Sequence, residues 1–183
     1  RKAKSWKENH IKGGDIIFNY ICHSIYYLEF LFGNINSIKT NIFFNKKKKI
    51  NSFKGTIFFK NNLSAKLNIQ AGNLNKSIKP THQLEISTQE KNYILKTNLN
   101  SLADKFRLIE IKKSSKKNEK ILFKDKDTKD DFRIMPTSKN LKKFSNSILK
   151  GKELSPNFYD AKRIHLIINK MFISSKKNKK IRI

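Results

Sequence analysis

The spacing of hydrophobic positions changes along this chain and divides it into three regions. The first is an apolar run over 16–32, broken by single polar residues, with Asp15 at its head and Gly33 at its end. Polar groups at that frequency are costly in lipid, so the pattern favours a buried amphipathic helix over a membrane span. Gly13 and Gly14 supply the turn into this helix, Asp15 caps it or favours its positive end, and Gly33 ends it.

The second region has the period of two that is typical of strands. Apolar residues alternate over 38–44, 53–59, 63–69, 84–87, 93–96, 106–111 and 121–123. Turn residues separate these segments, and Asn61-Asn62 is a hairpin signal because Asn tolerates positive φ. The middle of the chain is therefore predicted to be a largely antiparallel sheet with one apolar face.

The third region contains two predicted helices and a short final strand, 181–183. The first helix starts at Pro136, ends at Gly151, and is expected to turn an apolar stripe inward: Leu141, Phe144 and Ile148. Ser155-Pro156 introduces the second, with these inward residues: Phe158, Ala161, Ile164, Ile168, Met171 and Phe172. One helix, many strands and two helices predict an α+β fold. The length of 183 residues and the lack of repeats predict a single domain over 1–183.

The composition is strongly basic, with 41 Lys+Arg against 14 Asp+Glu and a net charge of +27. Charge of this sign suggests nucleic acid or an anionic membrane surface. However, the excess is nearly all Lys and accompanies heavy Asn, Ile and Phe usage, which an A+T-rich coding bias would also produce. The dense runs at 46–49, 112–120 and 176–180 fall where turns or a terminus are expected. Solvated loops are therefore favoured, and neither nucleic acid nor membrane is expected as a partner.

One cysteine, Cys22, is present, so no disulfide can form within the chain, and no Cys/His metal spacing occurs. A reducing cytoplasm is the simplest compartment for such a protein. The chain begins with Arg1 and shows no signal peptide, and that start suggests a fragment.

Asp15, Asn19 and His23 are spaced i, i+4, i+8, which places them on one stripe of a helix. A polar stripe on an apolar helix is costly unless it is satisfied or faces a cavity, so it is a candidate site. The alternative is a core histidine bonded to a neighbouring strand. Cys22 precedes His23, but adjacent helix positions point about 100° apart, so a small core cysteine is favoured over a Cys–His nucleophilic pair.

The same segment resembles a known signature. Trp6, the block from Gly13 to His23, Leu28, and the run to Gly33 are similar to the Gfo/Idh/MocA oxidoreductases, the family of glucose–fructose oxidoreductase and inositol dehydrogenase. Members show a Trp ahead of a glycine-rich start, a helix with Asp or Asn four residues before His, and a hydrophobic run to Gly. Asp131-Phe132-Arg133, Pro136, and the stretch 156–183 resemble the family's usual ending.

The resemblance implies the C-terminal half of an NAD- or NADP-dependent oxidoreductase, with a large, mostly antiparallel open sheet and helices on one face. His23 would act as acid/base or orient the substrate hydroxyl, and Asn19 would occupy the position often held by Asp. The substrate would be a sugar, sugar nucleotide or polyol, and the sheet face, with apolar positions such as Phe43 and Phe58, would form a homo-oligomer. Substrate contacts are expected from Tyr20, Trp6, Lys12 and Asp15.

The chain departs from the family pattern in three ways. Asp15 stands where a third glycine is usual, and Tyr26 stands where Asp often follows the His. No glycine-rich dinucleotide motif and no Glu-Lys-Pro segment occur, so cofactor binding is expected mainly from an upstream domain, and the chain by itself is expected to be inactive. Arg133 is expected to pair with a neighbouring Asp, and His82 and His165 to be surface or packing residues.

Two other functions stay open. A basic nucleic-acid-binding module would need Lys and Arg clustered on one face with aromatic residues for stacking. A non-catalytic assembly member of the same fold is the other, since Asn19 and Tyr26 both depart from the commoner residues.

Overall fold

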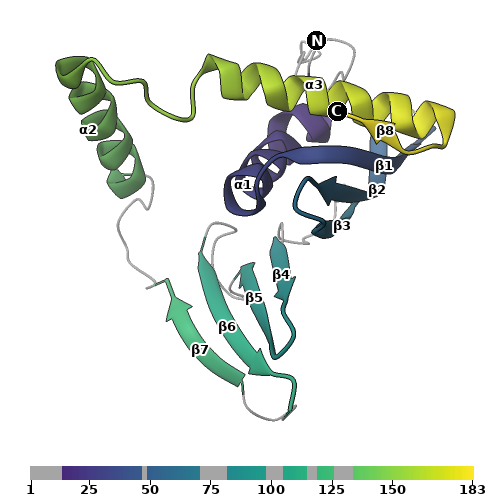
Figure 1. Cartoon of the computed structure of the whole chain (residues 1–183), viewed down its shortest axis with the longest axis horizontal. Helices are drawn as coiled ribbons and strands as arrows, with labels where there is room; N and C mark the ends of the chain where they lie inside the picture. The colour runs from purple at the N-terminus through teal and green to yellow at the C-terminus, as the bar shows by residue number, and fades with distance from the viewer. Residues whose placement is uncertain (1–13, 47–48, 71–81, 98–104, 115–118, 126–133) are drawn as a thin grey trace, which may run out of the picture. The chain divides into compact units, whose positions relative to one another are not determined.

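A computed structural model of the chain describes residues 14–46, 49–70, 82–97, 105–114, 119–125 and 134–183 (Figure 1). The chain divides into two compact units, residues 1–71 with 147–183, and residues 72–146. The described elements are a π-helix η3 (Ile17–Ile21), α1 (Cys22–Phe32), β1 (Ile35–Phe44), β2 (Ile50–Phe59), β3 (Ser64–Gln70), β4 (Gln83–Ser87), β5 (Lys91–Thr97), β6 (Phe106–Lys112), β7 (Glu119–Lys124), α2 (Ile134–Lys150), α3 (Phe158–Lys177) and β8 (Ile181–Arg182). The α+β class predicted from the sequence is confirmed.

Sheet A is the four-stranded sheet of the first unit, in the order β3-β2-β1-β8, with every pairing antiparallel. One face carries the predicted apolar positions, and Ile38, Phe53 and Ile57 are fully buried there. Gly55 lies opposite Thr40, where an added Cβ would come within 2.8 Å of the Thr40 Cγ2 atom. A side chain at Gly55 would therefore push β1 and β2 out of this packing.

Helix α3 packs on β1 through its own buried face, which includes Ile164, Ile168 and Met171. The helix starts well because Asn157 forms a capping box with Asp160. Its last turn carries Ser174 and Ser175, whose hydroxyls accept hydrogen bonds from the backbone N–H groups of Thr40 (3.0 Å) and Ile42 (2.9 Å).

The two serines complete an edge that the short strand β8 leaves open. β8 pairs with only Ser37 and Ile38 of β1. Beyond them, side-chain hydroxyls from α3 take the place of a neighbouring strand, and the Thr40 hydroxyl donates to the carbonyl of Met171 (2.6 Å). The backbone donors of Thr40 and Ile42 at this edge are thereby satisfied.

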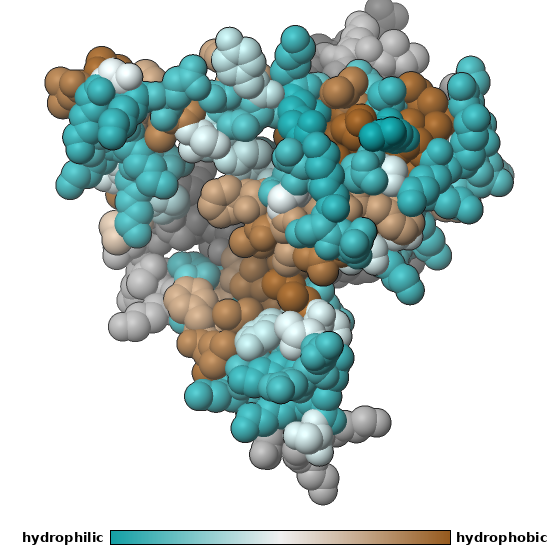
Figure 2. Space-filling model, in the orientation of Figure 1, coloured by the Kyte–Doolittle hydropathy of each residue, from teal (hydrophilic) through white to brown (hydrophobic). Residues whose placement is uncertain are grey.

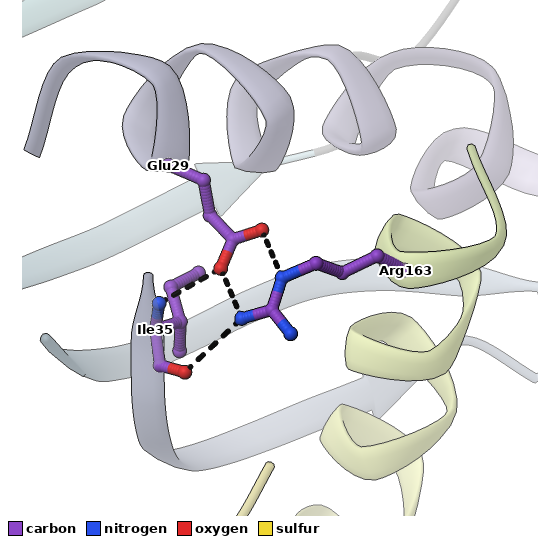
Figure 3. A network of polar contacts seen from close by, with 3 residues as sticks. All are labelled: Glu29, Ile35 and Arg163. Carbon is purple, nitrogen blue, oxygen red and sulfur yellow. Dashed lines mark hydrogen bonds and ion pairs between the residues drawn. The ribbon is translucent and has the colours of Figure 1, made fainter. Parts of the chain in front are cut away.

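A second group of polar contacts joins α1 to both β1 and α3 (Figure 3). Arg163 donates from Nε to Oε2 of Glu29 (2.8 Å) and from one terminal nitrogen to Oε1 (2.7 Å), a bidentate pair. Oε1 also accepts from the backbone N–H of Ile35 (2.8 Å), and the same guanidinium reaches the Ile35 carbonyl at 3.4 Å. Glu29 is one of the single polar residues that interrupt the apolar run of 16–32, and in the fold it joins three elements.

The second unit contains sheet B, in the order β4-β5-β6-β7, again with antiparallel pairings. The predicted strands of the middle region are confirmed, and the described ones are divided between two four-stranded sheets. Sheet B is less covered than sheet A: Ile109 is buried, while Ile121, Leu122 and Phe123 of β7 are exposed. Figure 2 shows apolar residues at the surface over β6 and β7.

Two details of the helix predictions are wrong. The apolar stripe of α2 does not face inward, because Leu141, Phe144 and Ile148 are 64%, 57% and 65% exposed. Figure 2 shows such apolar residues at the surface of α2 among its lysines. Phe158, at 94% exposed, and Ala161, also exposed, lie outside the buried stripe of α3. Periodicity identifies an amphipathic helix but does not say what covers its apolar face.

We expect Glu29→Gln to lower the free energy of unfolding by about 2–3 kcal/mol, because it leaves the Arg163 guanidinium without its carboxylate in a half-buried setting. Urea unfolding followed by circular dichroism measures this change. The matched control is Glu110→Gln, which breaks the Lys91–Glu110 pair of sheet B (3.1 Å) and should have less effect, because Lys91 makes one contact with that carboxylate whereas Glu29 has a bidentate pair and a backbone N–H bond. Equal losses from the two variants would contradict the central role given to Glu29.

Candidate functional site

One face of the helix formed by η3 and α1 is left uncovered by the described residues. The opposite face is buried and contains Ile17, Ile21, Ile25 and Leu28. On the uncovered side Tyr20 is 71% exposed, Phe30 is 74% exposed and His23 is also exposed. The predicted site residues Tyr20 and His23 therefore share an accessible, aromatic surface.

The first turn of this helix is a π-helix, which the sequence did not predict. The backbone N–H of Cys22 bonds to the carbonyl of Ile17, five residues earlier. π-helical turns are rare and frequently occur at functional sites. Asn19 lies inside this turn and is half-buried, and His23 is the second residue of α1, which follows the turn. The i, i+4, i+8 spacing of an ordinary α-helix therefore does not hold through this segment, and the roles predicted for Asn19 and His23 remain predictions.

Asp15 begins the helix from a left-handed backbone conformation, with φ 75°. This region is unfavourable for most L-residues, but Asp tolerates it because its short side chain bonds locally. Its carboxylate accepts from the backbone N–H of Ile16 (2.6 Å) and from that of Ile50 at the start of β2 (3.2 Å). Asp15 thus joins the start of the helix to sheet A, but its side chain accepts from no later N–H group of the first turn, so the predicted cap is not seen. Substrate contact by Asp15 remains a prediction.

Three side-chain contacts hold this helix along α3. Phe18 stacks on His165 with ring centroids 5.5 Å apart, and on Phe172 at 6.3 Å. The hydroxyl of Tyr26 lies 3.2 Å from that of Ser155, just before α3. Together with Glu29 these contacts fix the rotation of α1 about its axis, and so determine which face carries His23.

Cys22 is half-buried, and its Sγ lies 2.9 Å from the carbonyl of Phe18. Desolvation by burial raises the pKa of this thiol above its usual value. A raised pKa lowers the thiolate fraction at neutral pH, which argues against a nucleophilic role. Among the residues that the structure describes, no group of three or more His, Cys, Asp or Glu side chains could hold a metal ion.

The other candidates fall in different places. Trp6, Lys12 and Arg133 lie outside the described residues. His165 is exposed and packs on Phe18. His82 lies edge-on to Phe106 at 5.9 Å, where desolvation by burial lowers its pKa.

Comparison with solved structures identifies the fold. Levoglucosan dehydrogenase without ligand matches with a TM-score of 0.75 and 12% identity over 100% of this chain and 55% of that one. Aldose-aldose oxidoreductase from Caulobacter crescentus, complexed with glycerol, matches with a TM-score of 0.72 and 13% identity over 98% of this chain and 51% of that one. The chain has the fold of a Gfo/Idh/MocA-type oxidoreductase domain.

A complex of levoglucosan dehydrogenase with NADH and levoglucosan also matches this Gfo/Idh/MocA-type fold, with a TM-score of 0.70 and 14% identity over 98% of this chain and 53% of that one. The chain spans about half the length of the solved structures it matches. The predicted likeness to the C-terminal half of that family is thus confirmed at the level of the fold.

No protein-family model matches the sequence, and no curated protein matches it. Within the described residues, no helix is both long and apolar enough to cross a membrane.

We expect Asp15→Ala to destabilise the protein by about 2 kcal/mol, because alanine loses both backbone contacts and is strained at positive φ. Asp15→Asn is the matched control, since an amide oxygen still accepts and Asn tolerates the same φ. Thermal unfolding of both variants compares them. If Ala and Asn are equally stable, the carboxylate contacts do not hold the start of this helix.

Proposed function

We propose that this chain is the substrate-carrying half of an NAD- or NADP-dependent oxidoreductase that acts on a hydroxyl of a sugar, sugar nucleotide or polyol. The observation that carries the proposal is the uncovered face of α1, where an exposed histidine follows a π-helical turn on a domain of Gfo/Idh/MocA-type fold. Solved relatives of this fold bind NADH and levoglucosan or L-sorbose. The Gly-Gly…Asn…His block supplies the second line of support.

His23 suits the role of acid/base because one imidazole ring can both accept and donate a proton. In the oxidation direction, the neutral imidazole accepts the proton of the substrate hydroxyl while that carbon loses hydride. The amide of Asn19 donates to and accepts from a hydroxyl but carries no proton itself. Asn19 therefore positions substrate, and an Asp–His relay is absent from this proposal.

A nicotinamide cofactor would supply the hydride acceptor. The described residues fit part of such a group, since Tyr20 and His23 offer an exposed, unpaired surface for a flat ring. They do not fit its phosphates, because the sequence has no glycine-rich strand–turn–helix. We therefore propose that a further domain binds the dinucleotide and that α1 lies against the substrate.

Three accompanying expectations belong to the same proposal. The protein works in the cytoplasm, Trp6 and Lys12 contact substrate, and the chain forms a homo-oligomer. Activity requires the cofactor-binding part, so the 183-residue chain by itself should not reduce NAD or NADP.

We expect His23→Ala to lower kcat by about 10²-fold or more in the full-length protein, because proton transfer by a positioned side chain contributes that much. The assay follows NAD(P)H formation at 340 nm with sugars, sugar nucleotides and polyols as substrates. Lys162→Gln is the control: it changes an exposed side chain of α3 that takes no part in the contacts with α1 described above, and it should leave kcat nearly unchanged. Turnover that is indifferent to His23, or no turnover with any substrate, would support the non-catalytic assembly role instead.

We expect Asn19→Asp to move the acidic limb of the kcat/KM profile upward by about 0.5–1 pH unit. If residues 19 and 23 face one site, a carboxylate at position 19 favours the imidazolium of His23, and the protonated form does not accept the hydroxyl proton. Activity at low pH is therefore lost at a higher pH than in the wild type. An unchanged limb would show that Asn19 and His23 do not share a site.

A further inference from the structure

Helix α2, which the structure describes in full, has an apolar side that the described part of the chain leaves uncovered. With 3.6 residues per turn, four large apolar side chains fall within an arc of about 80°, and all are more than half exposed: Ile134, Leu141, Phe144 and Ile148. We call these four residues the α2 stripe. A helix of this kind is stabilised mainly by burial of its apolar side, so the α2 stripe indicates a partner.

The composition of α2 makes such a partner more important. Its 17 residues include three Ser, two Asn, one Thr and one Pro, all poorer helix formers than Ala or Leu. Its first turn carries no acidic residue that would interact favourably with the helix dipole. A helix of this length and composition is marginal in water without tertiary packing.

The shape of the α2 stripe fits the side chains of another protein element. Ile134, Thr137, Ser138 and Leu141 line a hollow of about 400 Å³ on this side of the helix. Protein elements pack by inserting side chains into such hollows, whereas a fluid lipid surface has no fixed side chain to insert. Three lysines lie on the opposite side of the helix and stay in solvent when the stripe is covered: Lys139, Lys143 and Lys150.

The area of the α2 stripe favours an occupant that belongs to the same chain. Four side chains of this size expose on the order of 400 Å², about half of the 800 Å² that each partner contributes to a standard interface between separate proteins. A second copy or a free protein would therefore be held weakly by the stripe alone. A domain joined by a linker is held at a high effective concentration, so a smaller interface keeps it docked.

Solved structures with this fold contain enough further chain for such a domain. Levoglucosan dehydrogenase matches 100% of this chain, α2 included, but only 55% of its own chain lies in the match. We propose that the α2 stripe is the surface on which the dinucleotide-binding domain of the same protein docks. This surface rests on the proposed function, which supplies that domain, and it leaves the sheet face with Phe43 and Phe58 for the homo-oligomer.

Two cysteine variants of the full-length protein test whether the stripe is covered. Leu141→Cys places a thiol in the stripe, and Lys143→Cys places one about 160° away on the same helix, where both native side chains are exposed in this structure. We expect Leu141→Cys to be alkylated about 10-fold or more slowly than Lys143→Cys, because reagent reaches a covered position only when the domains separate. Mass spectrometry of the peptide that contains each thiol measures the rates, which should be equal in urea.

Photo-crosslinking of the full-length protein identifies what covers the stripe. The probe is p-benzoylphenylalanine, introduced in place of Phe144 so that an aromatic ring is kept in the stripe. We expect a crosslink within one molecule to a peptide of the dinucleotide-binding domain. The same probe in place of Lys143 is the matched control and should give no such crosslink.

Several results would overturn the docking surface. Equal alkylation rates in the folded protein, or no crosslink from position 144, would mean that the stripe is open. A crosslink between two molecules, or protection that is lost on dilution, would assign the stripe to a second copy. A crosslink to another peptide of residues 1–183 would assign it to this chain's own fold, and binding to phosphatidylglycerol vesicles that Leu141→Ser abolishes would assign it to a membrane.

NADH and NADPH binding by the full-length protein, followed by nucleotide fluorescence, separates this surface from the proposed function. Binding of either nucleotide without a crosslink from position 144 to that domain would remove the docking surface alone. A full-length protein that binds neither nucleotide would remove the proposed function, and the docking surface with it.

Discussion

The first unit depends on one buried carboxylate. Glu29 lies in an otherwise apolar helix, and its side chain is only 10% exposed. Burying a charge in this way is costly unless every oxygen is satisfied. Arg163 satisfies both oxygens in a bidentate pair, and the backbone N–H of Ile35 uses the remaining capacity of Oε1. The contacts of Glu29 therefore fix both the position of α1 relative to α3 and the start of β1 (Figure 3).

Because α1 is a rigid helix, the contacts of Glu29 also orient the face of α1 that carries the candidate site. Glu29 and the Tyr26–Ser155 contact both oppose rotation of this helix, whose uncovered face carries His23. The π-helical turn then adjusts how Asn19 and Tyr20 are presented ahead of that histidine. The same contacts that stabilise the fold thereby position the proposed chemistry, and neither Glu29 nor Tyr26 needs to touch a substrate.

Strands and helices were predicted well from the sequence because each buries one face, and burial imposes a period. The alternation at Ile38, Thr40 and Ile42, and at Phe53 and Ile57, falls on the buried side of sheet A as predicted. The spacing of apolar residues predicted burial wrongly where the apolar face of a helix is exposed, as along α2 and at Phe158. It also could not show the π-helical turn or the Glu29–Arg163 pair, which join residues 134 positions apart. The polar stripe on an apolar helix identified His23 as a candidate, the family resemblance assigned it a role, and the structure shows that it is exposed.

The serine hydroxyls that bond to the edge of β1 can do so only late in the translation of the chain. The bond from Thr40 to Ser174 spans 134 residues, so β1, β2 and β3 leave the ribosome long before α3 exists to cover them. Until then the edge presents free backbone donors beside apolar strands, which is a template for pairing with other chains. The newly made protein is thus most prone to aggregate before its last quarter has been translated.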